Sequence, residues 1–159
     1  MTAEAPILIA YDGSDAARLA IGKAAELFAS RRIVVMTVWE PGLAAAMATP
    51  MPPLSGLAPG TVDIEAARDA DEQLQERAER IARDGADLAG AAGLDAEAIA
   101  VAEAKNVSDA ITGQAREAGA AAIVVGSRGL SGLRARMEGS TSSAVLKNAP
   151  CPVLVVHND

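Results

Sequence analysis

The chain has 159 residues, half of them apolar, and a formal net charge of −7 at pH 7. Its length and apolar content predict one packed domain over residues 1–159 rather than a disordered chain. The acidic balance argues against a nucleic-acid surface, the single Cys151 excludes an internal disulfide and a cysteine-cluster metal site, and no apolar run is long enough to span a bilayer. We therefore expect a cytoplasmic protein that contacts neither nucleic acid nor membrane.

The amino end predicts a buried strand followed by a helix. Residues 6–11 are a continuous apolar run, which is typical of a parallel strand covered on both faces. A polar segment, residues 12–15, interrupts the run, and apolar residues at helical spacing follow. Ser14 or Asp15 suits the N-cap of that helix. Asp12, at the carboxyl end of the strand, has two interpretations: it caps local backbone, or its carboxylate contacts a ribose or a metal ion near phosphates.

The middle of the chain predicts two strands, residues 33–39 and 96–102, around a long helix. That helix, residues 62–93, is amphipathic, with charged side chains such as Glu72, Arg80 and Arg83 on a solvated face. Its periodic apolar positions are Ile64, Ala67, Ala70, Leu74, Ala78, Ile81 and Leu88. Residues 41–61 are rich in Pro, Gly and Met, and we expect a surface loop there, or a segment that covers a ligand or meets a partner.

The carboxyl end predicts a helix over residues 107–118, a strand over 121–125, a helix after Gly139 and a last strand over 152–156. Strands and helices thus alternate, with connections long enough for parallel strands. We expect an α/β fold, a doubly wound, flavodoxin-like (Rossmann-like) parallel sheet of five strands in the order 3-2-1-4-5. Its crevice lies between the first and fourth strands.

A glycine loop and Asp12 converge on this crevice although they lie far apart in sequence. The loop contains Gly126, Gly129 and Gly139, followed by Ser140, Thr141 and Ser142. Glycines let backbone approach a ligand closely, and a helix start offers free N–H groups to an anion. Arg128 lies within this loop and has two interpretations: its guanidinium contacts phosphates, or it is a surface charge. An ordinary turn with a capped helix explains the same residues, so the loop alone leaves both interpretations open.

The flanking segments resemble the universal stress protein family. The stretch from Val124 to Gly129, the spacing to Gly139-Ser140 and the run Ala149-Pro150-Cys151-Pro152-Val153 are similar to its nucleotide-binding signature. The stretch from Ala10 to Ser14 fits the family pattern at the amino end. The resemblance covers nearly the whole chain and implies the adenine nucleotide alpha hydrolase-like form of the fold.

The resemblance also implies a ligand, ATP or a related adenine nucleotide together with Mg²⁺. It implies that Asp12 contacts ribose or nucleotide-bound Mg²⁺, and that Thr37 and Val38 lie against the base. The residues so expected to bind nucleotide are Ala10, Tyr11, Asp12, Thr37, Val38, Val125, Gly126, Arg128, Gly129, Gly139, Ser140, Thr141 and Ser142. A homodimer through the last strand, residues 152–157, and a regulatory role in the stress response are implied as well.

Two alternatives remain open beside nucleotide-dependent regulation. The first is a dimeric interaction module that binds no nucleotide. The second is a slow ATPase or autophosphorylating enzyme, with Ser140 to Ser143 as acceptors. We expect little or no catalysis, because no residue is placed as general base for water and His157, the only histidine, has no catalytic partner in sequence.

Overall fold

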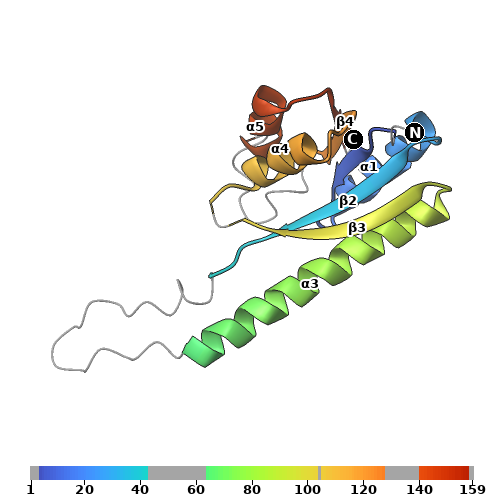
Figure 1. The fold of residues 1–159 in the computed structure, drawn as a ribbon. Helices are drawn as coiled ribbons and strands as arrows, with labels where there is room; N and C mark the ends of the chain where they lie inside the picture. The colour runs from blue at the N-terminus through green and yellow to red at the C-terminus, as the bar shows by residue number, and fades with distance from the viewer. Residues whose placement is uncertain (1–3, 43–63, 104, 128–139, 158–159) are drawn as a thin grey trace, which may run out of the picture.

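The computed structural model describes residues 4–42, 64–103, 105–127 and 140–157. These residues contain a five-stranded parallel sheet in the order β3-β2-β1-β4-β5 (Figure 1), which confirms the predicted topology. The strands are β1 Ile7–Ala10, β2 Arg32–Trp39, β3 Asp95–Ala102, β4 Ala122–Gly126 and β5 Val153–Val156. The helices are α1 Asp15–Leu27, α3 Ile64–Ala91, α4 Val107–Glu117 and α5 Ser140–Asn148.

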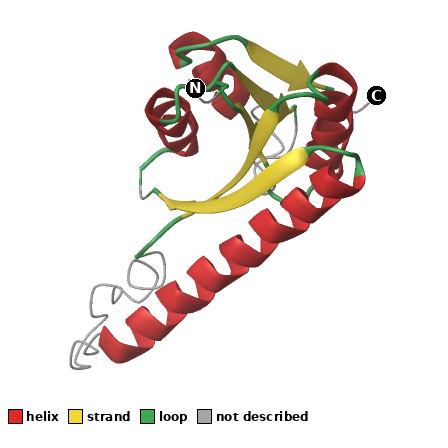
Figure 2. Cartoon of the chain, turned by 45° about the vertical axis from the view of Figure 1, so that its right-hand side comes forward, coloured by secondary structure: helices red, strands yellow, loops and turns green. Residues whose placement is uncertain are grey.

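Helices cover both faces of the sheet, so the fold is doubly wound (Figure 2). Side chains from α1 and α3 pack on one face, against Ile9, Val35 and Val124. Side chains from α4 and α5 pack on the other face, against Leu8 and Ile123. Every residue of β1 and β4 is buried, which explains why both strands are unbroken apolar runs in the sequence.

The long helix α3 packs on the sheet mainly through the predicted side, since Ala78 is buried and Ile81 packs against the core. Its fully buried positions are Ala78, Ala82, Gly85 and Ala89. Two of the large residues expected inward are instead exposed, Ile64 by 67% and Leu88 by 38%. Small side chains take the inner positions because they let the helix axis lie close to the sheet. The first turns of α3 extend beyond the sheet (Figure 1), which explains why Ile64 has no core to enter.

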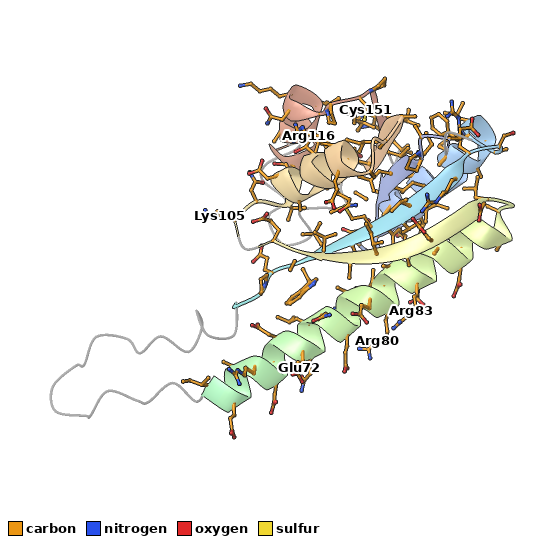
Figure 3. The ribbon with its side chains drawn as sticks, viewed as in Figure 1. Glu72, Arg80, Arg83, Lys105, Arg116 and Cys151 are labelled. Atoms are coloured by element: carbon orange, nitrogen blue, oxygen red, sulfur yellow. The ribbon has the colours of Figure 1, made fainter. Side chains whose placement is uncertain are left out.

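The outer face of α3 is solvated, as predicted. Glu72, Arg80 and Arg83 are labelled in Figure 3, where they point away from the sheet. The predicted loop at residues 41–61 lies outside the described residues beyond Gly42. Within the described ranges, no helix is long and apolar enough to cross a membrane.

Helix ends follow the expected local chemistry. The hydroxyl of Ser14 accepts from the amide of Ala17 at 3.2 Å and caps α1. Asn106 caps α4 in the same manner, and Gly119 follows that helix with a φ of 59°. Cys151 is half-buried against the α4/α5 side of the core, and this burial raises the pKa of its thiol.

Candidate functional site

The carboxyl ends of β2, β1 and β4 lie next to one another at one edge of the sheet. Ala10 pairs with Met36 of β2, and Ile9 pairs with Val124 of β4. The residues that follow these pairs therefore share an edge: Tyr11 and Asp12, Thr37 and Val38, Val125 and Gly126. The structure thus brings the strand-end members of the predicted set together, at the crevice expected between β1 and β4.

The turn between β1 and α1 is built around Asp12. Its Oδ1 accepts a hydrogen bond from the amide of Ser14 at 2.9 Å, and the intervening Gly13 has a φ of 82°. In the described part of the chain, Oδ2 of Asp12 has no hydrogen-bond partner, and the residue is half-buried. One oxygen therefore shapes the turn, as the capping interpretation requires, while the other remains available for a ligand.

Two hydrogen bonds fix the end of β1 to the end of β2. The amide of Tyr11 donates to the carbonyl of Met36 at 2.8 Å, and the hydroxyl of Thr37 donates to the carbonyl of Tyr11 at 2.8 Å. Thr37 is only 5% exposed. Its hydroxyl is thus occupied by the protein, and its backbone groups face β3, as those of Trp39 do; the backbone of Val38 faces the β1 side.

The predicted residues divide between the two faces of the sheet. Ala10, Val38 and Val125 belong to the apolar cluster on the α4/α5 side. Tyr11 belongs to the cluster on the α1/α3 side, and Thr37 shares that face by strand alternation. Since α5 carries Thr141 and Ser142, these two hydroxyl residues share the α4/α5 side with Ala10, Val38 and Val125.

Gly126, at the end of β4, lies against the first turn of α1. A Cβ on this glycine would come within 2.7 Å of the carbonyl carbon and 2.8 Å of the carbonyl oxygen of Ala16. No side chain fits there without backbone movement. Close packing therefore requires glycine at this position, independently of any ligand, and no local pattern in the sequence points to Ala16 as its neighbour.

The ring of Tyr11 packs beneath α3. A Cβ on Gly85 would lie 2.6 Å from Cδ1 of this ring, so the glycine leaves the space that the ring fills. Burial raises the pKa of Tyr11; the carboxylates of Asp84 and Asp12 raise it further, and the guanidinium of Arg18 opposes them. A glycine inside a helical pattern does not identify such a contact, because Gly90, in the same helix, has no atom within 4 Å of its Cβ position.

The remaining predicted residues are described in part. Arg128, Gly129 and Gly139 lie outside the described residues. Ser140 is the first residue of α5; Thr141 is half-buried and Ser142 is 9% exposed. The first turn of α5, the helix that follows β4 in the chain, has amide groups without intrahelical partners. No cluster of His, Cys, Asp and Glu in the described ranges has the arrangement of a metal site.

The fold and this edge define the class of protein: a doubly wound α/β domain with a polar turn after β1 and a glycine-ended β4 at the crevice. The family model of the universal stress protein family matches residues 5–157, so the chain belongs to that family. A universal stress protein of Thermus aquaticus is 31% identical over 152 residues, covering 94% of this chain and 96% of the relative.

Solved structures agree with this assignment. A universal stress protein in complex with cAMP is 26% identical, has a TM-score of 0.64, and is matched over 99% of this chain and 100% of its own. A universal stress protein from Archaeoglobus fulgidus in complex with dAMP shares the fold, with a TM-score of 0.62, 23% identity and coverage of 98% and 99%. The fold is thus one on which related proteins hold adenine nucleotides.

Proposed function

We propose that this protein binds an adenine nucleotide, ATP foremost, at the crevice between β1 and β4 and acts as a nucleotide-dependent regulator in stress responses. The observation that carries the proposal is the free Oδ2 of Asp12, held by the Ser14 hydrogen bond at the edge where β1, β2 and β4 end. The cAMP and dAMP complexes of related proteins support the ligand class.

The base fits the apolar part of this edge. Val38 is half-buried and offers its methyl groups on the α4/α5 side, while Ala10 and Val125 are buried in the core behind it. The backbone of Val38 is the source of polar contacts to an adenine edge, because the Thr37 hydroxyl is bonded to Tyr11 and the Thr37 backbone faces β3. Flat apolar contact with a few backbone hydrogen bonds is usual for small-molecule sites.

The sugar and phosphates fit the polar part. Asp12 accepts from ribose hydroxyls through Oδ2, or holds Mg²⁺ that accompanies the phosphates; carboxylate oxygen is a ligand that Mg²⁺ prefers. The amino end of α5, with Ser140, Thr141 and Ser142, supplies amide and hydroxyl donors to anionic oxygens. Gly126 contributes backbone only. Arg128, Gly129 and Gly139 belong to the proposed phosphate loop and lie outside the described residues.

Calorimetric titration with ATP and Mg²⁺ tests this function, with Asp12→Asn as the diagnostic variant. The asparagine oxygen still accepts from the Ser14 amide, so the turn is kept while the charge is removed. We expect saturable binding by the wild type, weakened about tenfold or more in Asp12→Asn, because a hydrogen bond or ion contact to a charged group is worth roughly 1.5–3 kcal/mol. Absence of binding by nucleotide-free wild type would remove the proposal.

A homodimer through residues 152–157 is a second part of the proposal. In the described sheet β5 pairs only with β4, so its other edge has backbone groups free to pair. This edge also suits the alternative of an interaction module without nucleotide, which the titration separates from the first proposal. A cytoplasmic location stays a prediction, as does a slow ATPase or autophosphorylating activity.

A further inference from the structure

We infer that Gly85 of α3 is a positioning residue for the nucleotide site, acting through the ring of Tyr11; the inference rests on the proposed function. A Cβ at Gly85 would lie 2.6 Å from Cδ1 and 2.9 Å from Cε1 of Tyr11, and 2.8 Å from Cγ1 of Val35. All three distances are shorter than real Cβ contacts. The ring of Tyr11 therefore occupies its position only because residue 85 has no side chain.

A short chain of contacts leads from this ring to the site. Tyr11 is 3% exposed, its amide donates to Met36, and its carbonyl accepts from the hydroxyl of Thr37. The next residue is Asp12, whose carboxylate is proposed to contact the nucleotide. Displacing the ring would move the peptide that carries both the Thr37 hydrogen bond and the start of the Asp12 turn.

Gly85 itself cannot touch the ligand. The ring of Tyr11 and helix α3 lie on the α1/α3 face of the sheet, whereas Ala10, Val38 and Val125 lie on the α4/α5 face. The effect must pass through Tyr11 to the peptide at the sheet edge. Gly85 is thus a positioning residue, and the site depends on a helix that forms none of its walls.

The conformation of Gly85 gives no other reason for a glycine. The residue is buried within α3 and does not have a positive φ, so its backbone suits any residue. Glycine is a poor helix former relative to alanine, and here only the close approach of Tyr11 and Val35 accounts for it. Gly90, in the same helix, is the matched control, because a Cβ added there would meet no atom within 4 Å.

The test compares Gly85→Ala with Gly90→Ala by ATP titration and by two-dimensional amide NMR. In Gly85→Ala we expect shifted amide resonances at Asp12, Gly13 and Thr37, and ATP affinity about tenfold weaker, since a displaced Asp12 loses its charged hydrogen bond or ion contact to the nucleotide. Gly90→Ala is expected to keep wild-type resonances there and wild-type affinity.

Further variants keep the inference falsifiable. If Gly85→Ala does not fold, Tyr11→Leu removes the ring while leaving Gly85, and the same shifts and loss of affinity are expected. In the double variant Gly85→Ala, Tyr11→Leu, the loss should be smaller than the sum of the single losses, because the shorter side chain frees part of the space. A Gly85→Ala protein that is less stable but keeps wild-type resonances at residues 12–13 and wild-type affinity overturns the inference.

The two readouts separate this inference from the proposed function. Absence of ATP binding by the wild type removes the proposed function, and the amide shifts then still decide whether Gly85 positions the end of β1. Normal ATP binding with unchanged shifts in Gly85→Ala removes the positioning role and leaves the proposed function intact.

Discussion

At Gly126, close packing explains a glycine that the sequence pattern assigns to a phosphate loop. Its position in a glycine motif points to a phosphate, yet its nearest neighbour is the backbone of Ala16 in α1, 2.7 Å from a Cβ that the glycine lacks. A substitution there changes the packing of β4 on α1 before it changes any ligand contact. Loss of nucleotide binding in a Gly126 variant would therefore not by itself identify a phosphate contact.

We predict that Gly126→Ala lowers the free energy of unfolding by about 1–3 kcal/mol, the usual cost of overpacking a tight interior. Gly113→Ala, in α4, is the control because no atom lies within 4 Å of its Cβ position, and alanine there should stabilise the helix by up to about 1 kcal/mol. Urea unfolding of the two variants measures the difference. Equal midpoints for both would contradict the close packing of β4 against α1.

Tyr11 is the only tyrosine in the chain, so the near-ultraviolet absorbance of phenolate reports it alone. Burial, Asp84 and Asp12 raise its pKa above the ordinary value of 10.0. The neutral phenol is thus favoured in the folded state. Its contribution to stability is fully present below pH 10.0 and is lost as the pH rises through the higher folded pKa.

We expect the phenol of Tyr11 to titrate above pH 10.0 in the folded protein and close to pH 10.0 in the urea-unfolded protein. The Tyr11→Phe variant has no phenol to ionise, so its free energy of unfolding should fall less than that of the wild type above pH 10.0. Near neutral pH its free energy of unfolding should change little. A folded-state midpoint at or below that of the unfolded chain would show that the ring is not buried as described.

Asp12 and Thr37 show which features of this site can be predicted from the sequence and which cannot. The capping interpretation of Asp12 is confirmed, since Oδ1 bonds to the turn, and contact of Oδ2 with a ligand stays a prediction. Thr37 lies at the expected edge, but its hydroxyl is bonded to Tyr11, which depends on the neighbour strand and not on any local pattern. Contacts between distant segments, such as Gly85 on Tyr11 and Ala16 on Gly126, have no local sequence signal.

At the scale of elements, the strands and their order were predictable because β1 and β4 are buried on both faces and are continuous apolar runs. Helix α3 was predictable in extent and, for the most part, in its buried face: Ala78 is buried and Ile81 packs against the core, as expected. The fully buried stripe also includes Ala82, Gly85 and Ala89, whereas the hydrophobic pattern favoured Leu88, which is exposed. At these positions small residues allow the close contact between the helix and the sheet.

The burial of α3 predicts an uneven stability along the helix. Its fully buried residues all lie between Ala78 and Ala89, while near its start Asp71 is the described anchor, accepting from the amide of Gly42 at 2.9 and 3.0 Å. We expect amide hydrogen exchange at residues 64–70 to be at least about tenfold faster than at residues 78–89, because opening the first turns exposes little buried surface. Uniform protection along α3 would contradict this.

At the scale of the whole molecule, the free edge of β5 is where a second copy would pair. The carbonyls of Pro152 and Val156 accept from the segment of β4, at 2.9 Å from Ile123 and 2.8 Å from Ser127. By the alternation of a parallel ladder, the amides of Val153 and Val155 point to the free edge.

We predict that the wild type sediments as a dimer and that Val155→Pro sediments as a folded monomer. Proline removes the outward amide that pairing between copies would use, and it is tolerated on edge strands. Circular dichroism checks that the variant is folded. A dimer that persists in Val155→Pro with unchanged affinity would exclude pairing through this edge, and a monomeric wild type at high concentration would exclude the dimer itself.

Nucleotide binding at the crevice is tested most directly by locating the ligand, with two-dimensional amide NMR during titration of the wild type with ATP and Mg²⁺. We predict saturable shifts at the carboxyl edge of the sheet, at residues 10–14, 37–38, 125–127 and 140–142. Residues at the opposite edge, such as Ile7, Ile33 and Ala122, should not shift. Saturable shifts confined to another surface, or none at all, would contradict nucleotide binding at the crevice between β1 and β4.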